Sequence, residues 1–200
     1  MIKKIETIAR QAIALDAKQA FHDSQWYAYA GEICACLDAD FSLPAHTSAG
    51  FIAALSPLNS WESQLKFTPP SLHACQALLA SGADCWQGIR GPGFFSNKHK
   101  AARILQGESP LDVLSGDKVR AFYLNLIGDF SVVTIDRHAV AIAGWQGSLT
   151  SRAYSRLSFA YKAAGESFGI SGAEIQALTW NHWRRTESAH SEANKRREAR

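Results

Sequence analysis

The sequence contains no continuous apolar segment that approaches the roughly 18 residues of a membrane-spanning helix. Its beginning, MIKKIETIARQAIALDAK, also lacks the continuous apolar stretch and small-residue cleavage site of a secretory signal peptide. We therefore expect a soluble protein without a membrane partner. The predicted compartment is the cytoplasm, or the host cytoplasm or nucleoid if the source is a virus.

Cysteine is scarce, and its spacing excludes two classes of protein. The four cysteines show neither paired C-x-x-C spacing nor the density of a disulfide scaffold: Cys34, Cys36, Cys75 and Cys85. We expect reduced, buried thiols, because free cysteine is usually a core residue. The seven histidines show no metal-ligand spacing such as H-E-x-x-H, so the sequence predicts no metal and no other cofactor.

Strand-like alternation is almost absent, while apolar residues recur at helical spacing along most of the 200 residues. The predicted fold class is therefore all-α. We expect a single helical domain over 1–185 and a disordered mixed-charge tail over 186–200, where apolar periodicity is missing. Several helix boundaries are marked by proline or by a capping residue: Pro57 ends a helix in AHTSAGFIAALSPL, Pro69 and Pro70 precede a helix at 71–80, Ser96 caps one at 98–105, and another follows Asp136. The remaining predicted helices cover 2–21, 24–37, 118–127, 150–165 and 171–185.

The net charge of +3 is too small to identify a dedicated nucleic-acid-binding domain. It permits a polyanionic partner without requiring one. A hydrophobic content of 46 % is enough to bury a proper core. The bulk properties therefore describe a globular protein and leave its activity to individual residues.

One lysine stands at the head of a strongly patterned helix. Apolar residues follow it at the i, i+3, i+4, i+7 and i+8 spacing of a helix with one buried face: Val119, Phe122, Tyr123, Leu126 and Ile127. Lys118 is thus predicted in the first turn, where the helix dipole disfavours a cation. That placement favours the neutral amine that a nucleophilic or Schiff-base lysine needs. For this residue alone, an exposed lysine that extends into solvent is the simpler interpretation.

Asp136 ends the short β-branched run SVVTI (131–135) and precedes an apolar helical pattern. It fits an N-cap, whose side chain accepts backbone N–H bonds. Helix 118–127 would be about 15 Å long, and the next eight residues can span that distance in reverse. Lys118 and Asp136, 136 − 118 = 18 residues apart, can therefore share one site, in which the carboxylate stabilises developing positive charge.

The order glycine, lysine, apolar helix, glycine, β-branched run and Asp-Arg-His resembles the helix-hairpin-helix DNA glycosylase superfamily, most of all its archaeal-type 8-oxoguanine DNA glycosylases. In that family a lysine at the start of the hairpin's second helix and an aspartate in a D-R-H segment form the catalytic pair. The resemblance implies that Lys118 is the Schiff-base nucleophile and Asp136 the carboxylate that assists base loss. It covers about 45–183, where GFFSNKHKAARIL, FIAALSPLNSW and EIQALTW are similar to other helices of the family.

The sequence departs from this family at the hairpin and in its cysteines. The family has G-x-G-x-K, whereas this chain has Leu114-Ser115-Gly116-Asp117-Lys118, so the first glycine is missing. The hairpin amides normally bind a DNA phosphate, and Asp117 would repel it, which disfavours ordinary duplex binding. The four-cysteine cluster that some relatives use for iron and sulfur is also absent, so the resemblance implies no metal cofactor.

The resemblance also suggests residues that contact the substrate. Arg137 and Lys98 would bind phosphate, and His138 would orient Asp136 or the base. The hairpin glycine and four aromatic side chains complete the set of candidates: Gly116, Trp61, Phe94, Phe95 and Trp180. Each has a plainer interpretation, since cations are commonly solvated and aromatic rings commonly belong to a core.

The predicted function is a DNA base-excision N-glycosylase with Schiff-base AP-lyase activity on a modified or damaged base such as 8-oxoguanine. Its partner is DNA, duplex or single-stranded, with the target base flipped out, and a monomer is the default assembly. Two alternatives stay open. The same scaffold can serve to modify or transfer a base, or the chain is a catalytically inactive helical module that binds nucleic acid or protein.

Overall fold

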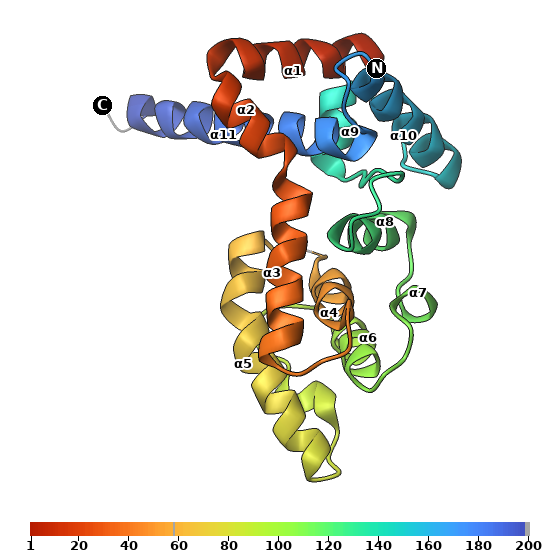
Figure 1. Ribbon diagram of the computed structural model, residues 1–200. Helices are drawn as coiled ribbons and strands as arrows, with labels where there is room; N and C mark the ends of the chain where they lie inside the picture. The colour runs from red at the N-terminus through yellow and green to blue at the C-terminus, as the bar shows by residue number, and fades with distance from the viewer. Residues whose placement is uncertain (58, 199–200) are drawn as a thin grey trace. The chain divides into compact units, whose positions relative to one another are not determined.

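The computed structural model describes residues 1–57 and 59–198, with side chains described as far as Glu187 (Figure 1). These residues form eleven α-helices and one short 3-10 helix, η1, and contain no β-strand. The predicted all-α class is therefore confirmed. The glycosylase-like subtype stays a prediction.

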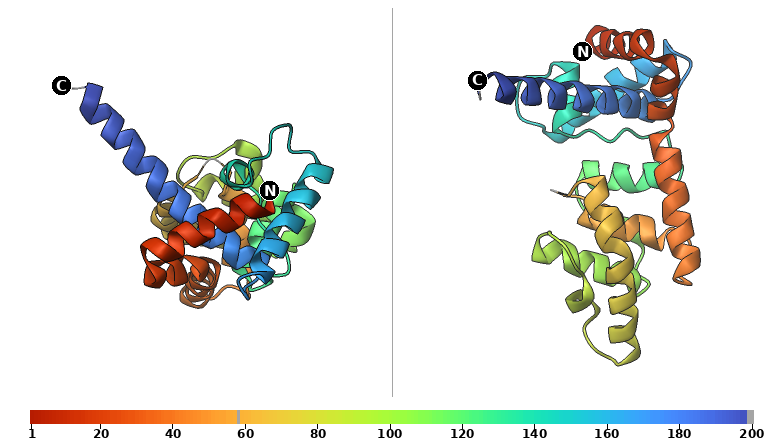
Figure 2. Two further views of the ribbon diagram at one scale, coloured as in Figure 1. Left: turned by 90° about the horizontal axis from the view of Figure 1, so that it is seen from above. Right: turned by 90° about the vertical axis from the view of Figure 1, so that its left-hand side faces the viewer.

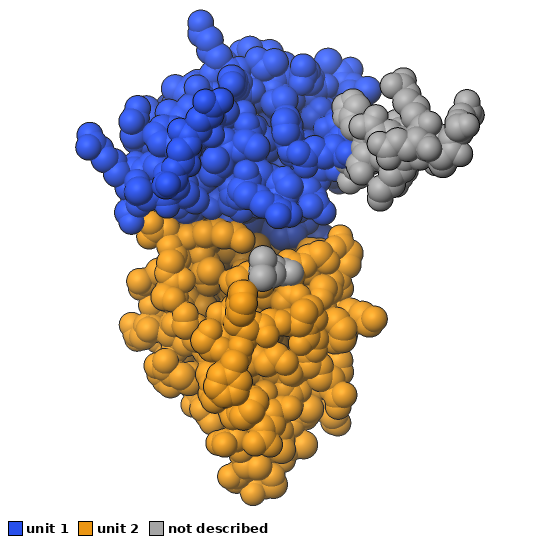
Figure 3. Space-filling view, turned by 180° about the vertical axis from the view of Figure 1, so that it is seen from behind, with its two compact units in different colours: residues 1–29, 129–200 blue, residues 30–128 orange. Residues whose placement is uncertain are grey.

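The chain divides into two compact units (Figure 3). Unit 1 consists of Met1–Tyr29 with Asp129–Arg200, and unit 2 consists of Ala30–Gly128. The sequence predicts one helical domain over 1–185, whereas the structure gathers the two ends of the chain into one unit and the middle into the other.

Unit 1 is organised around α10 (Ser151–Glu166) and α11 (Gly172–Glu198), which pack against each other (Figure 2). Its core includes the fully buried side chains of Leu157, Tyr161 and Ile175. The β-branched segment before Asp136 adds Val133 and Ile135 to this core without forming a helix or a strand. The helices of unit 1 are α1 (Ile2–Leu15), α2 (Ala17–Ser24), α9 (Arg137–Ala143), α10 (Ser151–Glu166) and α11 (Gly172–Glu198).

Unit 2 is built around a helix that is buried along its whole length. Every residue of α4 (Thr47–Leu55) is buried, and α6 and α8 pack against it. Such a helix is apolar on all sides because it has no solvent face. The other elements are α3 (Trp26–Asp40), whose first residues belong to unit 1, α5 (Trp61–Ala80), η1 (Cys85–Gly88), α6 (Phe95–Leu105), α7 (Pro110–Val113) and α8 (Asp117–Leu126).

The predicted first helix, 2–21, is wrong in one respect, because the structure breaks it at Asp16. That residue has an extended backbone, and its side chain accepts a bond of 2.9 Å from the Gln19 amide at the start of α2. Aspartate competes for backbone donors in this way, so it favours a cap over a helix interior.

The predicted helix start after Pro69 and Pro70 is also wrong. Helix α5 begins at Trp61, capped by Ser60, and carries both prolines inside it. A proline removes the bond to the carbonyl four residues earlier. Here those carbonyls belong to Leu65 and Lys66, which are both exposed residues of α5.

Two other boundaries differ from the sequence-based expectation. Helix α6 begins at Phe95, so Ser96 lies inside its first turn and Phe94 is the N-cap residue. Helix α11 passes the predicted end at Arg185 and continues to Glu198. The predicted domain 1–185 and tail 186–200 stay predictions, and residues 199–200 of that tail lie outside the described residues. The segment has no apolar periodicity, but it contains no glycine or proline and is rich in alanine, glutamate, lysine and arginine, which favour helix.

All four cysteines are free, as predicted. Cys34, Cys75 and Cys85 are buried, whereas Cys36 is exposed, so the expectation of burial is wrong for that residue. Burial of the Cys34 thiol raises its pKa to about 12. Within the described residues, no helix combines the length and the apolar character that crossing a membrane requires.

The core of unit 1 can be tested on one helix. We expect Leu157→Ala to lower the free energy of unfolding by about 2–5 kcal/mol, because its side chain is fully buried and truncation leaves a cavity. Phe159→Ala on the same helix is the control, since that ring is 68 % exposed. Urea unfolding followed by circular dichroism measures both variants. Equal losses would contradict the packing described.

Candidate functional site

The proposed nucleophile lies at the start of α8, in unit 2. Gly116 precedes the helix with a left-handed backbone, φ 85°, and contributes no side-chain cap. Lys118 lies in the first turn, as predicted, and is partly exposed. With the described residues it forms neither a hydrogen bond nor an ion pair. Its amine is thus not neutralised by a neighbouring carboxylate of the described part of the chain.

The body of α8 is fixed by packing within unit 2. Ala121, Tyr123 and Leu126 are buried, and α8 packs against α4. The side chain of Arg120 donates a bond of 2.6 Å to the Leu111 carbonyl of α7, which ties the two helices of the hairpin together. Burial raises the pKa of the Tyr123 hydroxyl, with the Asp38 carboxylate adding to the effect.

A second lysine reaches this hairpin from α6. The ammonium of Lys100 donates a bond of 2.6 Å to the Ser115 hydroxyl, next to Gly116. Sequence reasoning missed Lys100, because nothing in the spacing of residues 100 and 115 shows that they meet. Its position places a cation beside the turn that precedes Asp117, the first residue of α8.

The proposed carboxylate, Asp136, lies in unit 1, and both of its oxygens accept hydrogen bonds. Oδ1 accepts from the Ala139 amide at 2.8 Å, so the predicted N-cap of α9 is confirmed. Oδ2 accepts from the indole Nε1 of Trp180 at 2.9 Å. The predicted residues Asp136 and Trp180 therefore meet, although they lie 180 − 136 = 44 residues apart. The carboxylate is held in one orientation between α9 and α11.

Two tyrosines fix the backbone on either side of Asp136. The Tyr154 hydroxyl donates to the Val133 carbonyl at 2.8 Å and accepts from the Ile135 amide at 3.1 Å. The Tyr161 hydroxyl donates to the Ala139 carbonyl at 2.9 Å. Complete burial raises the pKa of Tyr161 well above its usual value, and the nearby Asp136 charge adds to the effect. Tyr161 therefore remains a neutral donor.

The Trp180 ring that bonds Asp136 is itself contacted by polar side chains of unit 1. The His138 ring meets Trp180 edge-on at 6.0 Å, and its Nδ1 lies 3.5 Å from a Glu187 carboxylate oxygen. The Arg184 guanidinium lies 5.4 Å from the centre of the Trp180 ring. We call Asp136, His138, Trp180, Arg184 and Glu187 the Asp136 cluster. Sequence reasoning found three of them. It missed Arg184, although this residue lies four positions after Trp180 inside the predicted helix 171–185, and it missed Glu187, which it assigned to a tail.

The other predicted substrate residues divide between the two units. Arg137, also in unit 1, is exposed, and its Nε donates to His138 at 3.3 Å. In unit 2, Lys98 donates to the Ile89 carbonyl at 3.0 Å. Gly116, Trp61, Phe94 and Phe95 also belong to unit 2. Lys118 therefore belongs to unit 2, and Asp136 belongs to unit 1.

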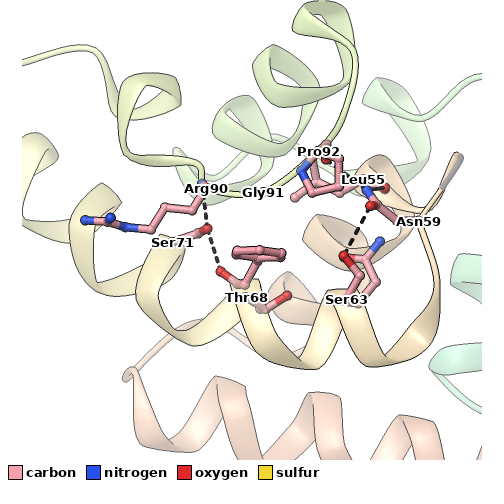
Figure 4. A pocket seen from close by; sticks show the side chains of 10 residues that line it. Leu55, Asn59, Ser63, Thr68, Ser71, Arg90, Gly91 and Pro92 are labelled. Atoms are coloured by element: carbon pink, nitrogen blue, oxygen red, sulfur yellow. Dashed lines mark hydrogen bonds between the residues drawn. The ribbon is translucent and has the colours of Figure 1, made fainter.

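A small hollow lies between α5 and the loop that follows η1 (Figure 4). Its cavity of about 10 Å³ holds roughly one water molecule, which is far too small for a nucleobase. The Arg90 side chain points away from it. None of the predicted site residues lines this hollow, whose walls are Leu55, Asn59, Ser63, Gln64, Phe67, Thr68, Ser71, Arg90, Gly91 and Pro92.

In the described part of the molecule, no group of three or more histidine, cysteine and carboxylate side chains could hold a metal ion. The candidate residues are therefore an amine at the start of α8 in unit 2 and a carboxylate held by α9 and α11 in unit 1. An amine of this kind can attack an electrophilic carbon, and a fixed carboxylate can stabilise positive charge.

The contribution of the two Asp136 hydrogen bonds can be measured as a change in the free energy of unfolding. We expect Asp136→Ala to lower the free energy of unfolding by roughly 2 kcal/mol, because the α9 cap is lost and the Trp180 N–H is left without its acceptor. Asp136→Asn keeps one acceptor oxygen and should cost clearly less. Urea denaturation measures both, and an Asp136→Ala variant as stable as the parent would contradict the geometry.

Comparison with curated proteins finds no match to this chain, and comparison with solved structures finds none either. A protein-family model matches residues 1–187, which includes all of unit 2 and the described side chains of unit 1. Its description, "Family of unknown function (DUF7178)", states no activity. Since the match extends over most of the chain, this protein belongs to the DUF7178 family.

Proposed function

We propose that this protein is a DNA base-excision N-glycosylase with AP-lyase activity, in which Lys118 forms a Schiff base. The substrate is a modified or damaged base such as 8-oxoguanine. The observation that carries the proposal is the start of α8, where Lys118 follows a left-handed glycine in an uncapped first turn. Helix α7, the turn to Gly116 and α8 give a helix–turn–helix arrangement that agrees with a glycosylase-like fold.

The first-turn position suits an amine nucleophile. Lys118 is partly exposed, and with the described residues it forms no ion pair that would hold its amine in place. The free amine attacks C1′ of the target nucleotide, the C1′–N bond breaks, and the base leaves with the bonding electrons and takes up a proton.

Asp136 is assigned the electrostatic part of the reaction. Its ionised carboxylate stabilises the positive charge that develops on the sugar as the base departs, and it accepts a proton from the attacking amine. The bonds from Ala139 and Trp180 fix its orientation, so little reorganisation is needed during the reaction. After the base has left, the nitrogen lone pair forms the C=N bond as the C1′–O4′ bond breaks, and O4′ takes up a proton, which gives the open-chain imine at C1′. The imine then allows β-elimination, in which C2′ loses a proton and the bond between C3′ and its oxygen breaks.

DNA is the proposed partner, with the target nucleotide flipped out of the stack because its glycosidic bond is unreachable inside a duplex. Lys98 and Arg137 are proposed to contact phosphate. Trp61, Phe94, Phe95 and Trp180 are the candidates for contacts with bases.

Borohydride trapping tests the nucleophile. The full chain is incubated with oligonucleotides that carry 8-oxoguanine, uracil or an abasic site, and the reduced covalent adduct is measured by denaturing electrophoresis. We expect an adduct that disappears in Lys118→Gln and persists in Lys18→Gln, whose lysine lies exposed on α2. If the folded protein gives no adduct with any substrate, the lyase mechanism fails. Base transfer by the same scaffold, or a binding module, then becomes the better account.

The role of Asp136 is tested by separating base release from the lyase step. We expect Asp136→Asn to slow release of the damaged base by about 100-fold or more, which is the usual contribution of such a group. The same variant should still give an adduct with a preformed abasic site, because no base has to leave. Release at the parental rate would remove Asp136 from the mechanism.

A further inference from the structure

Two neighbouring phenylalanines at the start of α6 present large apolar surfaces to solvent. Phe94 is 56 % exposed and Phe95 is 62 % exposed. The Phe95 ring is fixed by two neighbours, with its centre 4.9 Å from Trp86 and 4.2 Å from His99. Trp86 and His99 also contact each other, at 4.9 Å. We call Trp86, Phe94, Phe95 and His99 the α6 platform.

The segment that carries this platform has charge of one sign. From Trp86 to Gln106 every formally charged side chain is a cation: Arg90, Lys98, Lys100 and Arg103. Arg103 is paired with Glu108. Lys98 and Lys100 instead donate to uncharged oxygens, those of the Ile89 carbonyl and the Ser115 hydroxyl. Within the described residues, the positive charges of these two lysines are therefore not neutralised by an acidic partner.

Two of the rings and both lysines belong to α6, while Phe94 directly precedes this helix and Trp86 lies in η1. Phe95 and His99 are four residues apart, so they lie on the same face of the helix. Lys98 and Lys100 flank His99 in the sequence, and their ammonium groups are directed to different loops of unit 2. The two lysines therefore flank the face of α6 that carries Phe95 and His99.

We propose that the α6 platform binds single-stranded DNA, with bases stacked on its rings and phosphates near Lys98 and Lys100. Exposed rings beside cations are the combination that binds single strands, because every base offers a π-face and every nucleotide a phosphate. A duplex hides those base faces in its own stack. The inference deepens the proposed function and rests on it for the choice of DNA as the partner.

The hairpin in the same unit supports the preference for single strands. Asp117 lies exposed in the first turn of α8, where a glycosylase-type hairpin would bind a duplex phosphate. Its negative charge opposes that contact. Duplex binding is therefore weakened at the hairpin, while the α6 platform offers an alternative that needs unstacked bases.

Fluorescence anisotropy with the full chain tests this surface. The probes are a labelled oligothymidine of about 20 nucleotides and a labelled duplex of the same length, both undamaged so that no turnover occurs. We expect tighter binding of the single strand. Phe94→Ala combined with Phe95→Ala should weaken it about fivefold or more, the lower end of stacking effects. Phe159→Ala, which removes a ring that is 68 % exposed in unit 1, should leave it unchanged.

Further variants separate a loss of binding from a loss of folding. Phe95→Leu retains an apolar side chain without an aromatic face, and it should also weaken single-strand binding. Lys98→Ala and Lys100→Ala should each reduce the slope of log affinity against log salt by about 0.7, the value for one phosphate contact to a single strand.

Three results would overturn the inference: equal or tighter binding of the duplex, no binding of either probe, or full affinity in the phenylalanine variants. Binding is measured without chemistry, so the two proposals can fail separately. An adduct at Lys118 with unaltered binding in the phenylalanine variants removes only the α6 platform. Single-strand binding that depends on these rings, without any adduct, removes only the glycosylase mechanism.

Discussion

Both oxygens of the Asp136 carboxylate are bonded to protein donors, and the account of this protein depends on that constraint. One bond caps α9, and the other joins it to Trp180 of α11. A carboxylate fixed in this way is a preorganised acceptor that can stabilise charge without moving. Lys118 is the opposite case, because the described residues leave its amine free to approach a ligand. The proposed chemistry needs this combination of a fixed carboxylate and a mobile nucleophile.

The features that could be predicted from sequence are those that local chemistry determines. The all-α class follows from apolar periodicity, and the cap at Asp136 follows from its position before a helical pattern. The paired bonds of Ser171 and Glu174 at the start of α11 were predictable from their spacing, and both are present. Lys118 lies in a first turn for the same reason, since Gly116 and the apolar stripe after it mark where α8 begins.

The features that could not be predicted depend on contacts between residues far apart in the sequence, or on which residues of a helix are exposed to solvent. The Trp180–Asp136 bond and the Lys100–Ser115 bond join segments whose meeting no local pattern records. The prolines inside α5 are tolerated because the carbonyls that lose their partners are on an exposed part of the helix. Helix α11 continues without an apolar stripe because its composition alone favours helix. Tertiary context therefore decides the neighbours of the site, and local signals decide where its elements begin.

The most direct test of the central claim is to locate the covalent bond. The borohydride-reduced adduct with abasic DNA is digested with nuclease and trypsin and sequenced by tandem mass spectrometry. Trypsin does not cleave after a modified lysine, so the account predicts a sugar remnant on Lys118 in the peptide 104–120, which follows Arg103 and ends at Arg120. A remnant on Lys98, on Lys100 or on the N-terminal amine would contradict it, because the start of α8 would then not be the reactive centre.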